Sequence, residues 1–354
     1  MRRKLLLVGV SLVFSALLAE GLVRLVWHNP FSAEESELLV HVATQPPNAQ
    51  RKYMGPYAKG PPVVFRTDAR GYIVPARRGV AGAKTVVFFG GSTTECSGLG
   101  EAARFPALVG TILAARGVPV DTLNTGRSGN TTHETLNIFL NHALADRPDV
   151  AVMMHAVNDT GILAQNGDYS HAMAHRDGLR WGLKAIARAL AGKVALVGLV
   201  RFIRLGGVRH VGKQRVYAET RQKAPDLPFR QRLVAFVRLA GSFGITPVLL
   251  TQPMAYVRDK RTPTWAEPAK QAVFNDLIRA VGREEQAAVI DLAAHLRGID
   301  GWDTPDRFFY DGLHLNEAGS KVVAEVIANG LQPLIAERLE RDVALPAAAS
   351  AAVD

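Results

Sequence analysis

From about residue 84 onward, short apolar segments alternate with longer segments whose apolar residues recur every three or four positions. The short segments are typical of buried strands, and the longer ones of helices that bury one face. The predicted strands lie at 85–89, 118–123, 150–154, 244–251 and 288–292. This alternation is the mark of a parallel sheet covered by helices on both faces. We therefore predict an α/β protein, a three-layer α/β/α sandwich with a mostly parallel, five-stranded sheet.

The first predicted strand runs directly into Gly90-Gly91-Ser92. Two glycines allow the unusual backbone angles of a tight turn, and open α/β sheets keep their chemistry where the strands end. The same turn also occurs in phosphate-binding and purely structural settings. What Ser92 does therefore depends on the residues that the other strands deliver.

Three further polar segments follow the pattern. Gly129 comes after the second predicted strand, Asn158 after the third, and Asp311 with His314 after the last. Each of these residues alone also fits a structural role, as a helix cap or a turn former. Their joint occurrence, each behind its own predicted strand, favours a catalytic site.

These segments resemble, in order, the four sequence blocks of the SGNH/GDSL hydrolase family across residues 84–341. The blocks correspond to Gly90-Gly91-Ser92-Thr93, Ser128-Gly129-Asn130, Ala156-Val157-Asn158-Asp159 and Asp311-Gly312-Leu313-His314. The resemblance implies a flavodoxin-like strand order. Two blocks depart from the family pattern, because Gly91 and Thr93 replace an aspartate and a leucine, and Ala156 replaces a glycine. The Gly-x-Ser-x-Gly turn of α/β-hydrolases is absent around Ser92, which argues against that fold.

The chemistry of ester cleavage explains these residue types. A serine hydroxyl is a weak nucleophile without a neighbouring base, and His314 is the candidate base for Ser92. Asp311 is the candidate partner that orients the imidazole. The resemblance places the oxyanion hole at the backbone N–H groups of Ser92 and Gly129 and the side-chain amide of Asn158.

No cofactor and no metal are expected. His171 and His175 have the spacing of metal ligands on a helix, but no third ligand is evident. His133 and His155 adjoin the proposed site residues, and packing roles are favoured for both over contacts with substrate.

One helix prediction concerns the segment after the second block. Thr131 and Glu134 have the spacing of a capping box. The helix that follows is predicted to bury Leu136, Phe139 and Leu140.

The N-terminus combines a basic start with an apolar run. Met1-Arg2-Arg3-Lys4 is followed by an uncharged segment from Leu5 to Ala19. This pattern fits either a membrane anchor over 1–27 or a cleaved signal peptide. We favour the retained anchor, because Leu17 occupies a position where signal peptidase sites carry small residues. The positive start predicts that the remainder is exported to the periplasmic or extracellular face; secretion after cleavage is the alternative.

The remaining organisation follows from composition along the chain. Residues 28–83 lack periodicity and contain two Pro-Pro pairs, so we predict a stalk that becomes an extended lead-in, with a strand-like piece at 63–67. Residues 84–341 form the predicted hydrolase domain, interrupted by an insertion at 160–229. Basic residues recur every four positions from 180 to 188, on a helix that either packs on the core or contacts anionic lipid or substrate. The tail 342–354 is predicted to be disordered.

Charge and cysteine content limit the function classes. The 42 lysines and arginines against 32 acidic residues give a net charge of +10, which favours anionic surroundings. No pattern of a nucleic-acid-binding module is present. The single cysteine, Cys96, excludes an internal disulfide.

Together these features predict an exported, membrane-anchored serine esterase or deacylase that forms a seryl-acyl intermediate. The expected substrate is an acetylated or otherwise acylated glycan, a lipid or a small ester. Two alternatives stay open: an acyltransferase acting on an envelope glycan, and a glycan-binding protein of the same fold without catalysis. The sequence does not determine the oligomeric state.

Overall fold

The computed structural model describes residues 2–27, 43–53, 62–76, 79, 81–166, 169, 190, 193–204, 226–255, 268–304 and 306–351. Contacts divide the chain into two units. The smaller unit spans Met1–His41 and Ser170–Glu219, and the larger unit spans Val42–Tyr169 and Thr220–Asp354. The sheet predicted from the sequence lies in the larger unit.

The strands of this sheet are short and buried, as expected for strands covered on both faces. They are β3 (Lys84–Gly90), β4 (Val120–Asn124), β5 (Val150–Met154), β6 (Thr246–Leu250) and β7 (Ala288–Ile290). All neighbouring pairs are parallel, and the order across the sheet is β4-β3-β5-β6-β7. Numbered along the chain this is 2-1-3-4-5, the flavodoxin-like order. The predicted fold class is confirmed.

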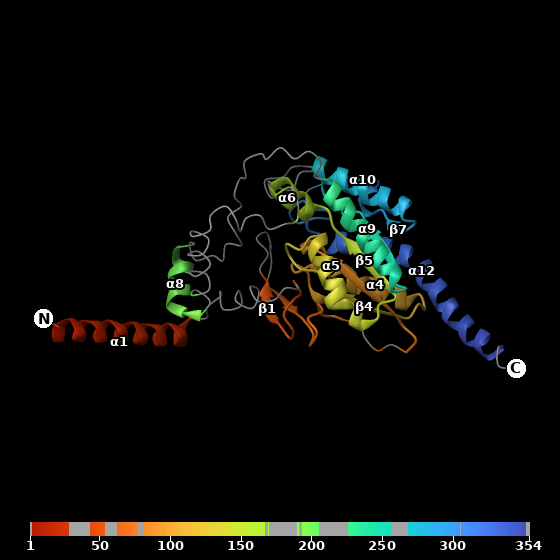
Figure 1. The fold of residues 1–354 in the computed structure, drawn as a ribbon. Coiled ribbons are helices and arrows are strands. Elements are labelled where there is room, and N and C mark those ends of the chain that lie inside the picture. The colour runs from red at the N-terminus through yellow and green to blue at the C-terminus, as the bar shows by residue number, and fades with distance from the viewer. Residues whose placement is uncertain are drawn as a thin grey trace. The chain divides into compact units, whose positions relative to one another are not determined.

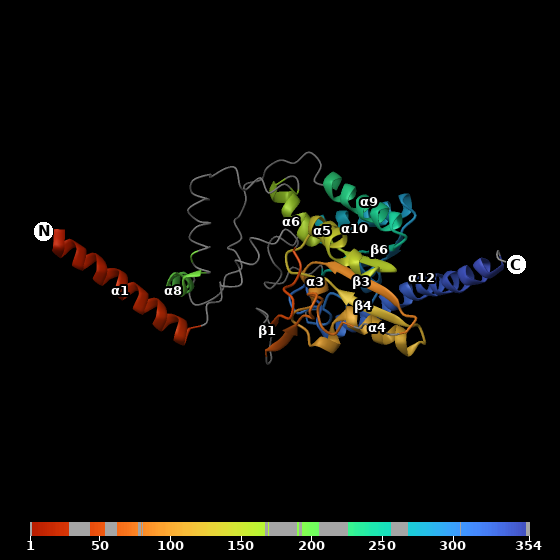
Figure 2. The same cartoon turned by 60° about the horizontal axis from the view of Figure 1, so that its bottom comes forward.

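Helices form the two outer layers (Figures 1 and 2). One face of the sheet packs against α4 (Phe105–Ala115), α11 (Leu292–Arg297) and α12 (Glu317–Ala351). The other face packs against α5 (Thr132–Asn141), α9 (Asp226–Ser242) and α10 (Pro268–Glu284). Alternate residues of each strand point to opposite faces, so every strand contributes to both cores.

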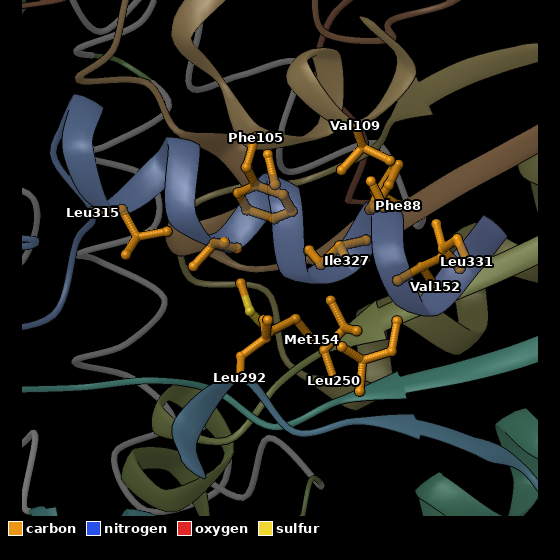
Figure 3. Packing of buried hydrophobic residues seen from close by; sticks show 14 of the residues in the cluster. Phe88, Phe105, Val109, Val152, Met154, Leu250, Leu292, Leu315, Ile327 and Leu331 are labelled. Carbon is orange, nitrogen blue, oxygen red and sulfur yellow. The ribbon is translucent and has the colours of Figure 1, made fainter. Parts of the chain in front are cut away.

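Figure 3 shows the first core, where Phe88 of β3 meets Phe105 of α4 and Ile327 of α12. In the second core, the rings of Phe89, Phe139 and Phe236 pack against one another, with centroids 5.8–6.0 Å apart. Full burial of one such side chain stabilises the fold by about 1.5–3 kcal/mol. These two cores hold the sheet rigid beneath the loops that follow its strands.

Helix α5 begins as predicted and differs from the prediction in one buried residue. Thr131 and Glu134 form the capping box, and Phe139 is fully buried. Leu140, predicted to be buried, is 43% exposed. Consecutive helical residues point about 100° apart, so the helix that turns Phe139 to the core carries Leu140 toward solvent.

Part of the predicted stalk belongs to the larger unit. Strand β1 (Gln50–Tyr53), which was not predicted, pairs antiparallel with β2 (Val63–Arg66), which was. Phe65 and Tyr72 are fully buried, and the Ile73 N–H donates to the Asn124 carbonyl at the end of β4. From residue 43 onward, the described part of the predicted stalk and extended lead-in thus packs on the larger unit; two widely spaced aromatic residues produce no periodic signal in the sequence.

The smaller unit contains α1 (Arg2–Val26) and α8 (Ala195–Arg204). Val8–Val26 is a 19-residue stretch with a mean hydropathy of 1.8, long and apolar enough to cross a membrane. A signal sequence near an N-terminus has the same properties. The predicted insertion at 160–229 is described only in part, and His171, His175 and the basic residues at 180–188 lie outside the described residues.

The short helix α6 (Val157–Asn166) occupies the start of the predicted insertion and packs with the larger unit. At the other end of the chain, α12 continues to Ala351. The helix thus includes residues 342–351 of the tail that the sequence predicts to be disordered, where alanine, the strongest helix former, is abundant.

Candidate active site

The turn after β3 places Ser92 at the first position of the short helix α3 (Ser92–Glu95). Ser92 is partly exposed, while the three residues after it are buried. A Cβ atom on Gly91 would lie 2.5 Å from the Asn158 Nδ2 atom. A side chain at this position would displace the Asn158 amide, so Gly91 leaves room for that amide beside the turn.

The candidate base and its partner sit on one small loop. Phe309 and Leu315 form an antiparallel bridge, and the Tyr310 N–H donates to the His314 carbonyl at 3.0 Å. The prediction that this motif follows its own strand is wrong, because the loop lies between α11 and α12, well beyond the end of β7. The Ala255 N–H, beyond the end of β6, donates to the Gly312 carbonyl at 2.8 Å. This bond fixes the loop at the carboxyl edge of the sheet.

Ser92, His314 and Asp311 form a continuous hydrogen-bonded chain. The Ser92 Oγ atom lies 2.7 Å from His314 Nε2, and His314 Nδ1 lies 2.6 Å from Asp311 Oδ2. The other carboxylate oxygen of Asp311 accepts the backbone N–H groups of Leu313 at 3.0 Å and His314 at 2.7 Å. An ionised carboxylate only accepts hydrogen bonds, so Nδ1 carries the proton and Nε2 is left to accept from the serine.

Asn158 and the loop carrying Gly129 meet beside the same turn. The Asn158 side-chain amide donates to the Asn130 carbonyl at 2.8 Å. Gly129 has a positive φ of 88°, a conformation that favours glycine, and is exposed. The residues that the sequence singled out for the oxyanion hole are thus gathered around Gly91 and Ser92.

A buried carboxylate, not predicted from the sequence, fixes the loop that carries Gly129. Glu95 Oε2 accepts from the Ser128 N–H at 3.0 Å and from the Ser128 hydroxyl. Glu95 Oε1 accepts from Gln45 at 2.8 Å and Arg51 at 2.9 Å. Both donors come from the predicted stalk. In the sequence, Glu95 stands out only as an acidic residue in a turn of otherwise small residues.

A buried glutamine links the turn to the segment of Asn158. Gln252 donates through Nε2 to Thr93 Oγ1 at 3.0 Å and accepts the Val157 N–H through Oε1 at 2.9 Å. Its own backbone is held by the side chains of Asn275 and Gln271. The nucleophile turn and the third block therefore share one rigid support.

Tyr310 covers one face of the candidate base. Its ring is stacked on the His314 imidazole, with centroids 5.5 Å apart and planes inclined by 10°. Burial raises the pKa of the Tyr310 phenol and also that of Tyr53 on β1. Both phenols therefore stay neutral, and Tyr310 packs its ring against His314.

The two histidines next to the blocks differ in exposure. His155 is buried, with Nε2 2.7 Å from Thr135 Oγ1, and burial lowers its pKa to about 4. A buried neutral imidazole with a protein partner is a packing group, as favoured from the sequence. His133 is half-buried on α5, near Tyr169.

Asp159, four residues beyond His155, is also buried. Its Oδ1 atom accepts from Thr132 and Tyr169, while Oδ2 lies 3.7 Å from His155 Nδ1. Burial raises the pKa of Asp159 to about 6.

A parallel α/β/α sandwich with serine, histidine and aspartate joined at the carboxyl edge of its sheet has the architecture of a hydrolytic enzyme. Residues 88–322 match the sequence model of the GDSL-like lipase/acylhydrolase family, and the chain belongs to that family. The resemblance seen in the sequence is thereby confirmed. Membership supports an enzyme that hydrolyses ester bonds.

Solved structures with similar folds include two bacterial enzymes. A lipase/acylhydrolase from Enterococcus faecalis is 21% identical, with 71% of this chain and 96% of that chain covered and a TM-score of 0.46. An acetylxylan esterase from Geobacillus stearothermophilus is 15% identical, with coverage of 70% and 94% and a TM-score of 0.43. No curated protein matches the sequence.

Proposed function

We propose that the protein is a serine esterase that removes an acyl group, most simply acetyl, through a seryl-acyl intermediate. The observation that carries the proposal is the chain of hydrogen bonds from Ser92 Oγ through His314 to Asp311. Family membership supports ester hydrolysis, and this geometry supplies a nucleophile and base for it.

The geometry supports the following order of steps. Ser92 Oγ attacks the ester carbonyl carbon while His314 Nε2 takes the hydroxyl proton. Asp311 stabilises the imidazolium that forms, and the alcohol leaves with the proton from Nε2. Water then attacks the acyl-serine with His314 again as base, which releases the acid and restores Ser92.

The negative charge of each tetrahedral intermediate is met by neutral donors. Ser92 begins α3, and the first N–H groups of a helix have no acceptor within it. The Gly129 N–H and the Asn158 amide complete the proposed oxyanion hole. Loss of one such donor typically costs about 3 kcal/mol of transition-state stabilisation.

We further propose that α1 is retained as a membrane anchor and that the larger unit is exported. Support comes from two polar residues of α1. Glu20 accepts the backbone N–H groups of Ala195 and Leu196, both at 2.7 Å, and Arg24 donates to the Lys193 carbonyl at 2.7 Å. A segment removed after translocation has no such part in the folded protein.

The esterase proposal is tested with acetyl esters and acetylated glycans as substrates for the full chain in detergent. Wild-type protein should release acetate and react with a fluorophosphonate probe, and Ser92→Ala should lower kcat by about 10⁴-fold or more. Full activity of Ser92→Ala would refute the mechanism. Acetyl transfer to a glycan acceptor without acetate release would replace the esterase by a transferase, and binding without turnover would indicate a non-catalytic protein.

A further inference from the structure

Helix α8 lies beside the C-terminal end of α1 within the smaller unit (Figures 1 and 2). Although α1 is an apolar helix, it contacts α8 through a charged pair. Glu20 and Arg24 of α1 are joined at 2.7 Å. Both oxygens of Glu20 accept N–H groups at the start of α8. A carboxylate inside an apolar segment is costly unless it is paired, and α8 supplies the missing donors.

The depth of this contact along α1 can be judged from helix geometry. Glu20 precedes Trp27 by about seven residues, or roughly 10 Å at 1.5 Å per residue. Trp27 contacts Phe202 of α8, with ring centroids 5.8 Å apart. Tryptophan is enriched at the boundary between hydrocarbon and water. The start of α8 therefore lies within the outer layer of any bilayer that α1 crosses.

The face of α8 turned away from these contacts carries exposed apolar side chains within the described residues. Ala195 and Gly198 are buried, whereas Val200 is 45% exposed and Ile203 65% exposed. Val200 and Ile203 are three positions apart and so share one face of the helix. Lys193 and Arg204, which bracket this face, are also exposed.

We propose that α8 is an interfacial helix that lies in the headgroup layer of the membrane, with Val200 and Ile203 inserted among the acyl chains. This inference rests on the proposed anchor. Amphipathic helices with basic flanks insert about 5–10 Å into this layer, which agrees with the depth set by Glu20. The occupant of the apolar face is lipid, and the flanking lysine and arginine favour anionic headgroups.

The experiment uses the full chain in vesicles of phosphatidylcholine and phosphatidylglycerol. Val200→Cys is labelled with an environment-sensitive nitrobenzoxadiazole dye. The native Cys96 is buried, and burial raises the pKa of its thiol to about 12, so wild-type protein provides the unlabelled background. Val273→Cys is the matched control, since Val273 on α10 is 53% exposed and takes no part in the α1–α8 contact.

Brominated phosphatidylcholine should quench the label at position 200 about threefold or more relative to the label at 273, and its emission should shift to the blue. Flotation of both variants with the vesicles checks the anchor separately. Flotation with an unquenched, water-like label at 200 overturns the interfacial helix and leaves the anchor standing. A blue-shifted label that bromine does not quench places protein on this face and also overturns the inference. Absence of flotation overturns both, while esterase activity reports on neither.

Discussion

Asp311 uses both carboxylate oxygens, one for the imidazole and one for the backbone of its own loop. In Asp311→Asn, the amide oxygen can keep the two backbone N–H groups while the amide nitrogen faces His314 Nδ1. That nitrogen donates, so the imidazole proton moves to Nε2 and no acceptor remains for Ser92. We expect kcat to fall by about 10³–10⁴-fold with unchanged thermal unfolding. A loss below tenfold would contradict the role of Asp311.

Glu95 touches no substrate in the proposed mechanism and is a positioning residue. In Glu95→Gln, the amide nitrogen meets donors on Ser128 or on Gln45 and Arg51, which releases the loop that carries Gly129. A displaced oxyanion donor should lower kcat by about 10- to 100-fold while KM changes little. Steady-state kinetics on an acetyl ester measure both constants.

The matched control for Glu95 is Glu101, a carboxylate paired with Arg66 of the same two-stranded sheet but on the surface. Glu101→Gln should retain wild-type kinetics, because exposed ion pairs contribute little. If the two variants lost activity equally, the Glu95 network would have no special part in positioning the loop.

Asp159 gives a prediction about pH. Because burial raises its pKa from 3.8 to about 6, the folded state holds this proton more tightly than the unfolded chain does. The residue therefore contributes stability that is present below about pH 4 and lost as the pH rises through about 6. Asp159→Asn keeps an oxygen acceptor for Thr132 and Tyr169 but does not ionise.

We compare the free energy of unfolding of Asp159→Asn with that of the wild type. The variant's value minus the wild-type value should be about 2 kcal/mol larger at pH 7.5 than at pH 4.5. Denaturant titrations at the two pH values measure this change. His155, whose pKa burial lowers, lies 3.7 Å from Asp159, so His155→Gln alone and combined with Asp159→Asn separates its contribution. A difference that is constant with pH would show that Asp159 does not titrate in this range.

At the scale of elements, α5 provides two neighbouring residues with opposite environments. Phe139→Ala removes a ring packed between Phe89 and Phe236 and should cost about 3–5 kcal/mol of unfolding free energy. Leu140→Ala, one position along, should cost less than about 1 kcal/mol, because that side chain is largely exposed. Chemical denaturation followed by circular dichroism compares the two, and equal costs would contradict the packing of this helix.

The elements that the sequence predicted well are those whose burial produces a local signal. Strand β5 is an unbroken apolar run, β3 contains one at 86–89, and the capping box of α5 is a fixed spacing of two residues. Strand β1 carries Arg51 and Lys52 and left no such signal. Its importance depends on its pairing with β2 and on the contact of Arg51 with Glu95, which is distant in sequence.

The candidate site shows the same division. Ser92, Asp311 and His314 were found because their spacing matches a family pattern, and the structure brings them together. Gln252 and Glu95 were missed, because a buried polar residue that supports others is defined by its partners rather than by its neighbours in sequence.

At the scale of the whole molecule, the contact between α1 and α8 predicts the fate of the N-terminus. If α1 stays in the folded protein, N-terminal sequencing of the membrane-bound form should begin at Met1 or Arg2, and carbonate washing should leave the protein in the membrane. A mature protein that starts near Glu20 would contradict retention.

Ser92 and His314 form a hydrogen bond although they lie 222 positions apart in the chain. They are therefore synthesised at different times. Synthesis delivers α1 and the serine early, whereas the base arrives with one of the last loops. An incomplete chain that has not yet formed this loop carries Ser92 without the base His314. Ser92 cannot act as a nucleophile in such a chain. In the proposed mechanism, catalysis therefore begins only when the loop that carries His314 docks beside Ser92.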